Sequence, residues 1–554
     1  MYFRQKKSGN RTYLQIVESH RQDGQPRQRV IATLGRLDEL TRNGQLEALL
    51  ASGARFAPGA MVLNAFAQGE ISSVDKISIG PGLIFERLWQ QTGIASVLQE
   101  LSRDRRHGFV LERAIFRTVV HRLCCPGSDR AADRWRQTVR LADTDAIALH
   151  QVYRAMAWLG EELEEQTDKT PFAPRCTKDL IEERLFERRR DLFTSLDLVF
   201  FDTTSIYFEG AGGETVGQLG HSKDSRPDLK QMVVGAVLDS AGRPILCELW
   251  PGNTTDVKTL VPIVTRLQRR FAVANVCIVA DRGLISRETI AEITGRGWSY
   301  ILGARLRSSK EVRDAVLSRG GRYQVVHGAR VDSKDPSPLK VKEVSVEGRR
   351  YIVCLNDDQA KKDAADREAI LEGLRNKLTQ GDKALVGNQG FRKFLTGKGA
   401  GFAIDDEQVK AEARFDGKWV LRTNTTLPAA EVALKYKELW QVEDLFRTTK
   451  SLLETRPIYH KCDATIRGHV FCSFLALVLR KALLDRLEQR GEVLEWADIV
   501  RDLNGLEEIR VDQHDKQFLL RSQVTGVCSK VFQAVGVALP PTVRAFPRPE
   551  VANA

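Results

Sequence analysis

The sequence has none of the motifs that mark several large enzyme classes. A Gly-x4-Gly-Lys-Ser/Thr phosphate loop is missing, and so is a Gly-x-Ser-x-Gly nucleophile elbow. These absences argue against a P-loop nucleotidase and against an α/β-hydrolase. No Cys-x-x-Cys pair occurs among the nine cysteines, and several of them lie in apolar runs such as residues 276–279. We therefore expect buried thiols in a reducing compartment and no structural zinc site.

Long hydrophobic runs are also missing. The longest one, residues 470–479, is closed by Arg467 and Arg480 and is too short to span a bilayer. The first ten residues lack the apolar core of a signal peptide. We therefore expect a cytosolic protein with no membrane partner.

The composition is that of a globular protein with more basic than acidic residues. The 554 residues are 42% hydrophobic and 28% charged, which is typical of a soluble chain with several folded units. Lys and Arg number 84 against 72 Asp and Glu, so the net charge is +12. This excess favours a polyanionic partner, with nucleic acid first. The charge balance alone fits DNA, RNA or an acidic membrane surface.

The amino-terminal segments are basic. We assign residues 1–60 to a hairpin region, because residues 1–36 carry a net charge of +6 and two β-rich runs flank a turn at residues 22–26. Residues 79–195 have helical periodicity and many arginines, which indicates a DNA-binding or dimerisation region. A solvated hairpin and a salt-bridged helical surface are the alternatives.

The rest of the chain predicts an α/β fold, a mixed sheet flanked by helices and interrupted by a β-rich insertion. Residues 196–305 have the order strand, hairpin, helix, strand, helix, strand. The following segments are an insertion (306–415), a second part of the core with a long helix from Pro428 to about Glu454 (416–460), a C-terminal helical region (461–540) and a Pro-rich tail expected to be frayed (541–554).

Two aspartates follow apolar strands of the predicted sheet. Asp202 comes after residues 196–201, and Asp281 comes after residues 276–280. Neighbouring strands that end on carboxylates would present both at one sheet edge. Hard divalent ions such as Mg²⁺ prefer oxygen ligands of this kind. The alternative for each aspartate is a residue that only caps a turn.

A stripe of polar and aromatic residues follows on the helix after Pro428. Its members are Tyr436, Trp440, Glu443, Arg447 and Lys450, separated by four, three, four and three residues. At ~100° per residue they share one helix face. An adjacent apolar stripe of Leu439, Val442, Phe446 and Leu453 can dock on the sheet, so that Glu443 could reach toward the two aspartates. An ordinary amphipathic helix with a Glu443–Arg447 pair is the alternative.

Together these segments resemble the insertion-sequence-four superfamily of DDE transposases over roughly residues 196–460. The signature Tyr-x2-Arg-x3-Glu-x6-Lys is matched by Tyr436, Glu443 and Lys450, whereas Leu439 stands in place of the arginine. A phosphate contact of that arginine would pass to Arg447. Residues 220–231 and 251–256 also look like blocks of one branch of these enzymes.

The resemblance implies an RNase H-like catalytic domain. In it, Asp202, Asp281 and Glu443 would be the catalytic residues and would ligate two Mg²⁺ ions, with Mn²⁺ as a substitute. The reaction would cleave DNA at the ends of an insertion sequence and join those ends to target DNA. The implied DNA-binding residues are Tyr436, Trp440, Arg447, Lys450, Lys223, Arg226 and Lys230.

The resemblance also implies the partners and the setting. These are double-stranded DNA (terminal inverted repeats and target DNA), a homodimer in the DNA complex, and a bacterial, nucleoid-associated location. Two other functions fit the same residues. One is a metal-dependent nuclease on the same fold without strand transfer, and the other is a transposase-derived DNA-binding protein that is no longer catalytic.

Overall fold

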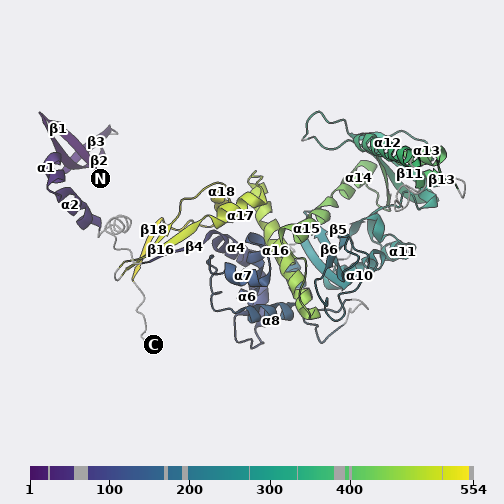
Figure 1. Cartoon of the computed structure of the whole chain (residues 1–554), viewed down its shortest axis with the longest axis horizontal. Helices are drawn as coiled ribbons and strands as arrows, with labels where there is room; N and C mark the ends of the chain where they lie inside the picture. Colours follow the sequence, from purple (N-terminus) through teal and green to yellow (C-terminus); the bar gives the residue numbers. More distant parts are fainter. Residues whose placement is uncertain are drawn as a thin grey trace. The chain divides into compact units, whose positions relative to one another are not determined.

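The computed structural model describes residues 1–22, 25–54, 73–166, 173–189, 197–273, 275–333, 335–379, 393–397, 402–513 and 516–547. The chain divides into two compact units. Figure 1 labels their helices and strands in sequence colours. The first comprises residues 1–84, 134–142 and 486–554. The second comprises residues 85–133 and 143–485, and contains the predicted catalytic core.

The first unit begins with an antiparallel sheet of β1 (Tyr2–Ser8), β2 (Arg11–Gln22) and β3 (Gln25–Arg36). The predicted hairpin is confirmed, because β2 and β3 pair from Tyr13 opposite Arg36 to Gln22 opposite Gln25. Residues 23 and 24 of the predicted turn lie outside the described residues. Helices α1 (Leu37–Arg42) and α2 (Gln45–Ala54) follow.

The same unit contains a second sheet that the sequence did not predict. Strands β4 (Ser73–Ser78), β16 (Glu507–Gln513), β17 (Lys516–Arg521) and β18 (Val543–Pro547) pair antiparallel in the order β18-β17-β16-β4. The prediction of a mostly helical 461–540 region is therefore wrong at residues 507–513 and 516–521. Val511 and Phe518 are buried there, as expected for two-residue alternation. Helices α17 (Trp496–Asn504) and α18 (Cys528–Val535) flank the hairpin in sequence.

The predicted frayed tail is wrong for residues 543–547, because β18 is held by ladder pairing with β17. Residues 548–554 of that tail lie outside the described residues.

Helices make up the predicted helical region, as expected over its described part. They are α4 (Gly80–Gln91), α5 (Ile94–Ser102), α6 (Leu111–Cys124), α7 (Asp129–Trp135), α8 (Leu149–Leu159) and α9 (Thr177–Arg189). Residues 167–172 and 190–195 lie outside the described residues. Helix α6 is buried along its whole length, so Arg113, Arg117 and Arg122 point into the protein. These three arginines make internal contacts, and phosphate contacts in this region would come from other arginines.

The second unit is built on a nine-stranded mixed sheet. Its first five strands in sequence are β5 (Leu198–Tyr207), β6 (Gln231–Asp239), β7 (Pro244–Pro251), β8 (Cys277–Ala280) and β9 (Ser299–Gly303). They lie in the order β7-β6-β5-β8-β9, with β5, β6 and β7 antiparallel and with β8 and β9 parallel to β5. Helix α10 (Leu260–Arg270) connects β7 to β8, and α11 (Arg287–Gly295) connects β8 to β9. The predicted element order is confirmed, including the cap of α11 by Ser286, which accepts from the backbone of Thr289.

The predicted insertion extends this sheet. Its strands β10 (Gln324–His327), β11 (Leu339–Val346) and β12 (Arg349–Leu355) lie beyond β15 (Lys418–Thr423), which pairs with β9. Helices α12 (Asp357–Thr379) and α13 (Asp406–Ala413) belong to the same region, with the short pair β13 (Leu395–Thr396) and β14 (Ala403–Ile404). Residues 398–401 of the Lys/Gly-rich stretch lie outside the described residues.

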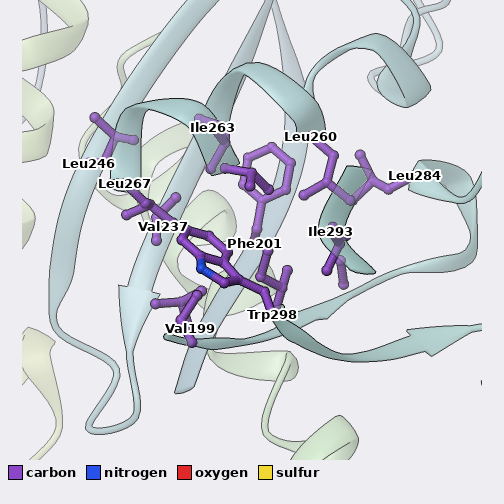
Figure 2. Packing of buried hydrophobic residues seen from close by; sticks show 14 of the residues in the cluster. Val199, Phe201, Val237, Leu246, Leu260, Ile263, Leu267, Leu284, Ile293 and Trp298 are labelled. Carbon is purple, nitrogen blue, oxygen red and sulfur yellow. The ribbon is translucent and has the colours of Figure 1, made fainter. Parts of the chain in front are cut away.

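One face of the central strands packs on α10 and α11. Figure 2 shows Val199 and Phe201 of β5 among Leu260, Ile263 and Trp298, all buried. Successive side chains of a strand point to opposite faces. Because Phe201 faces this core, Asp202 points to the other face of the sheet, where α15 (Trp440–Arg447) packs against β5 and β6.

The helices of the described residues include none that combines the length and the apolar content needed to cross a bilayer. The long helix α16 (Asp463–Gln489) contains the longest apolar run of the sequence and is buried there along most of that run.

Candidate active site

Asp202 of β5 lies next in register to Asp281, the residue that follows the parallel strand β8. Phe201 of β5 is the register partner of Ala280 of β8. Strand β8 ends at Ala280, so Asp281 follows a strand end as predicted. Asp202 does not, because β5 continues to Tyr207 through its pairing with β6. The aspartate instead stands in mid-strand, at the point where its parallel neighbour ends.

Burial makes Asp202 hard to ionise. Desolvation raises the pKa of its carboxyl to about 6, and the nearby carboxylates of Asp281 and Asp256 act in the same direction. The Lys223 ammonium and the backbone N–H of Thr203, which lies 2.7 Å from Oδ1, oppose this rise. Burial therefore disfavours the charged form of this carboxyl, and a bound cation would stabilise that charged form.

Tyr436 fixes the orientation of Asp281. Helix α14 (Ala429–Lys437) carries Tyr436, whose hydroxyl donates to Asp281 Oδ1 at 3.0 Å. Burial and the Asp281 charge raise the pKa of Tyr436 well above its usual value, so the hydroxyl keeps its proton. Gly303 leaves room for this contact, because a Cβ there would lie 2.4 Å from the Tyr436 oxygen. The structure thus places a predicted DNA-binding residue against a predicted metal ligand.

Glu443 lies on a helix that is interrupted. The sequence predicted one helix from Pro428 to about Glu454, whereas the chain forms α14, α15 and a π-helical turn, η6 (Thr448–Leu452). Leu439, Val442 and Phe446 are buried, as the predicted apolar stripe required. Glu443 is on the exposed side of α15.

A cavity of about 760 Å³ brings several predicted residues together. Asp281, Tyr436, Trp440 and Glu443 all line it. Its charged lining also includes Arg282, Arg307, Asp363, Lys418 and Lys437. Trp440 is 59% exposed, so its indole is available to a ligand. Asp202 is not among the described residues that line this cavity.

The donor set fits a hard divalent cation, because every candidate ligand atom is a carboxylate oxygen. Within the described parts of the chain, Asp202, Asp281 and Glu443 do not place one oxygen each within 4.8 Å of one another. A shared ion would have to draw these side chains closer together.

Asp256 is a fourth carboxylate at the site, and the sequence did not single it out. The Thr203 hydroxyl donates to Asp256 Oδ1 at 2.7 Å, and Lys223 Nζ lies 3.1 Å from Asp256 Oδ2. Lys223 also donates to the Thr203 carbonyl oxygen at 2.7 Å. Lys223, predicted as a DNA contact, therefore pairs with the Asp256 carboxylate near Asp202. The only sequence signal for Asp256 was its place at the end of the 251–256 block.

Asp224 holds two basic residues together and was also missed. Its Oδ1 lies 2.7 Å from Lys450 Nζ and 2.5 Å from Arg456 Nη1. The side chain of Asp224 is 5% exposed and that of Lys450 is 11% exposed. Lys450 is therefore anchored by a buried carboxylate, and only part of its surface is open to a ligand.

The other predicted DNA-binding residues lie on the exposed surface. Arg447 pairs with Asp444 at 2.9 Å rather than with Glu443, and its side chain is 71% exposed. Arg226 pairs with Asp228, and Lys230 donates to the Ala211 carbonyl oxygen at 3.0 Å. The structure does not gather these three with the cavity residues.

We expect Asp224→Asn to lower the free energy of unfolding by about 3 kcal/mol, because the substitution leaves two largely buried cations without their shared anion. Urea denaturation measures this change. Asp228→Asn is the matched control, since it breaks an exposed pair with Arg226 and should cost less than about 1 kcal/mol. Equal losses for the two variants would contradict the assigned role of Asp224.

Comparison with protein families gives two matches. Residues 194–479 match the family model of the transposase DDE domain, which is slightly more than half of the chain. Residues 3–62 match the model of the IS1634 family transposase N-terminal domain. No curated protein matches the chain. The larger match contains β5, β8 and α15, and therefore Asp202, Asp281 and Glu443.

Proposed function

The chain belongs to the DDE transposases of insertion sequences, and we propose that it cleaves DNA at the ends of its own element and joins those ends to target DNA with Mg²⁺. One observation carries the proposal. Asp202 of β5 and Asp281, which follows the parallel strand β8, are next in register, and the acidic residue Glu443 lines the same cavity as Asp281. Transposases bind DNA and DDE domains use divalent metal ions; the choice of Mg²⁺ and the joining step belong to the proposal.

We further propose that β7-β6-β5-β8-β9 is an RNase H-like core. The support is its topology: three antiparallel strands are followed by two strands parallel to the first, with helices in the connections. Asp202 lies on the first of these strands and Asp281 follows the fourth. The strands β15, β12, β11 and β10 then extend this core at its β9 edge.

Asp202, Asp281 and Glu443 would hold two Mg²⁺ ions, with Mn²⁺ as a substitute. When bound, the ions supply an activated water or DNA 3′-hydroxyl and stabilise the leaving 3′-oxygen. The chain's own residues prepare this site. Tyr436 keeps the Asp281 carboxylate in one orientation by its hydrogen bond, and Lys223 limits repulsion between Asp202 and Asp256.

The DNA contacts form the next part of the proposal. Trp440 is exposed beside Glu443 and can stack on a displaced base. Lys450, Arg447, Arg226 and Lys230 would contact phosphates, together with the basic lining of the cavity. The basic β1–β3 sheet lies, except for Tyr2, within the segment that matches a transposase N-terminal domain, and it would bind the terminal inverted repeats. A homodimer would hold the two element ends together.

A joining assay tests this function. The purified chain is incubated with Mg²⁺, a target plasmid and pre-cut DNA carrying the two ends of its element, and we expect covalently joined products. The control substrate has the same length and a scrambled end sequence, and should remain unjoined. A parallel reaction uses uncut ends, and cleavage there without any joining of the pre-cut ends would indicate a nuclease instead. Binding with neither reaction would indicate an inactive DNA-binding derivative.

A further inference from the structure

We propose that Asp129, His460 and His469 form a second metal site, which takes a transition-metal ion such as Zn²⁺. Asp129 begins α7, His460 lies in the segment that precedes α16, and His469 lies on α16. In the described ranges, no other set of three His, Cys, Asp or Glu side chains has ligand atoms that all lie within 4.8 Å of one another. Neither the sequence motifs nor the family matches assign a role to these residues.

Two of the three separations between ligand atoms are already those that such an ion needs, and the third is within 4.8 Å. His460 Nε2 lies 3.1 Å from His469 Nδ1 and 3.3 Å from Asp129 Oδ2. A tetrahedral ion with bonds of about 2.0 Å requires ligand atoms roughly 3.3 Å apart. Small movements would therefore be enough to place an ion between the three groups.

The surroundings of the histidines orient them for binding. His469 Nε2 lies 3.1 Å from the Thr455 carbonyl oxygen, so the proton belongs on Nε2 and the lone pair of Nδ1 faces the cluster. A hydrogen bond of this kind on the far nitrogen is usual for metal-binding histidines. The ring of Tyr153 meets the ring of His460 edge-on, with centroids 5.6 Å apart, and limits its rotation.

The donor set selects the class of ion. Two imidazoles and one carboxylate suit Zn²⁺ or Co²⁺, whereas Mg²⁺ prefers oxygen ligands. The three residues line a cavity of about 930 Å³, which leaves space for a water molecule as the fourth ligand. The acidic residue Glu454 lines the same cavity and adds negative charge. This site would therefore differ from the carboxylate site in both ion and chemistry.

Arg122 is the group that competes with a metal ion. Its Nη2 lies 2.9 Å from His469 Nδ1, the atom that the ion must take. Its Nη1 bonds to the His469 carbonyl oxygen and to the Ser473 hydroxyl, and these contacts can hold the guanidinium when Nη2 is displaced. A bound ion would tie α7 and α16 to the segment that carries Arg456, the partner of Asp224.

Cobalt titration of the full chain tests the proposal. The Asp281→Asn protein is used, so that the carboxylate site does not contribute, and Co²⁺ is added after removal of metals by a chelator. We expect one equivalent of Co²⁺ to bind with visible d–d absorption that a hundredfold excess of Mg²⁺ leaves unchanged. His460→Gln should weaken Co²⁺ binding by more than about 100-fold. Loss of a residue that only hydrogen-bonds to a metal ligand costs about 10- to 100-fold, so a larger loss identifies His460 as a ligand itself.

His221→Gln is the matched control, because His221 is exposed and outside the cluster. Its Co²⁺ affinity should equal that of the parent. Asp129→Asn replaces His460→Gln if circular dichroism shows that the latter is unfolded. Absence of Co²⁺ binding by the parent would overturn the proposal, and so would binding that survives substitution of His460 or Asp129.

Discussion

Asp202→Asn, Asp281→Asn and Glu443→Gln should each reduce Mg²⁺-dependent cleavage of end-containing DNA by at least about 10³-fold. Each substitution keeps the shape of the side chain and removes one anionic metal ligand. Metal ions supply several kcal/mol of transition-state stabilisation, and each 1.36 kcal/mol is a factor of ten in rate. Single-turnover cleavage followed on denaturing gels measures the loss and also separates hairpin products from nicked ones.

Asp444→Asn is the matched control for Glu443→Gln. Asp444 is the next residue on α15 and pairs with the exposed Arg447, so its substitution should leave the rate within a few-fold of the parent. Circular dichroism of all four variants separates loss of chemistry from loss of folding. Full activity in any one of the three carboxylate variants would remove that residue from the site.

Without bound metal, Asp202→Asn should raise the free energy of unfolding, which is the second large effect. The pKa of Asp202 is raised from 3.8 to about 6. The folded protein therefore binds this proton more tightly than the unfolded chain does. The stabilisation that this bound proton gives to the folded state is fully present below pH 3.8 and is lost as the pH rises through 6. At pH 8 the parent therefore has a free energy of unfolding about 3 kcal/mol lower than it would have with the proton bound. The asparagine variant avoids that loss.

Urea denaturation at pH 4 and pH 8 measures this difference. The stability of the variant relative to that of the parent should rise by about 2 kcal/mol from pH 4 to pH 8, because at pH 4 the parent still keeps most of the stabilisation that protonated Asp202 provides. Mg²⁺ should stabilise the parent at pH 8 and have little effect on the variant, because the variant lacks one ligand. If the difference in the free energy of unfolding between variant and parent does not change with pH, the pKa of Asp202 is not raised in the folded protein.

Local sequence patterns predicted the core of the sheet well. The runs that became β5 to β9 are apolar and bounded by turn residues, and Ser286 is a strong helix cap. Asp281 could be placed at a strand end from its own segment. The mid-strand position of Asp202 could not, because it depends on β5 being longer than its parallel neighbour β8. The roles of the three acidic residues stay a prediction.

Contacts between segments that are distant in the chain could not be predicted from the sequence. Asp224 meets Lys450 across 226 residues, and Thr203 meets Asp256 across 53. Neither aspartate lies in a local pattern that differs from an ordinary loop. The arginines of α6 illustrate the same limit, since the sequence shows their charge but not their burial. Strand β16 does alternate charged and apolar residues, but its partner β4 lies near the other end of the sequence, so local patterns could not show their pairing.

Continuous pairing from β9 through β15 to β10 limits how this chain can be shortened. Excising residues 306–423 would leave β9 as an edge strand with unpaired amides, which favours aggregation. The same deletion would remove Arg307 and Lys418 from the wall of the cavity that contains Glu443. A shortened version of this transposase must therefore keep the strands of the insertion. Any deletion should begin with the helices of the insertion, α12 and α13.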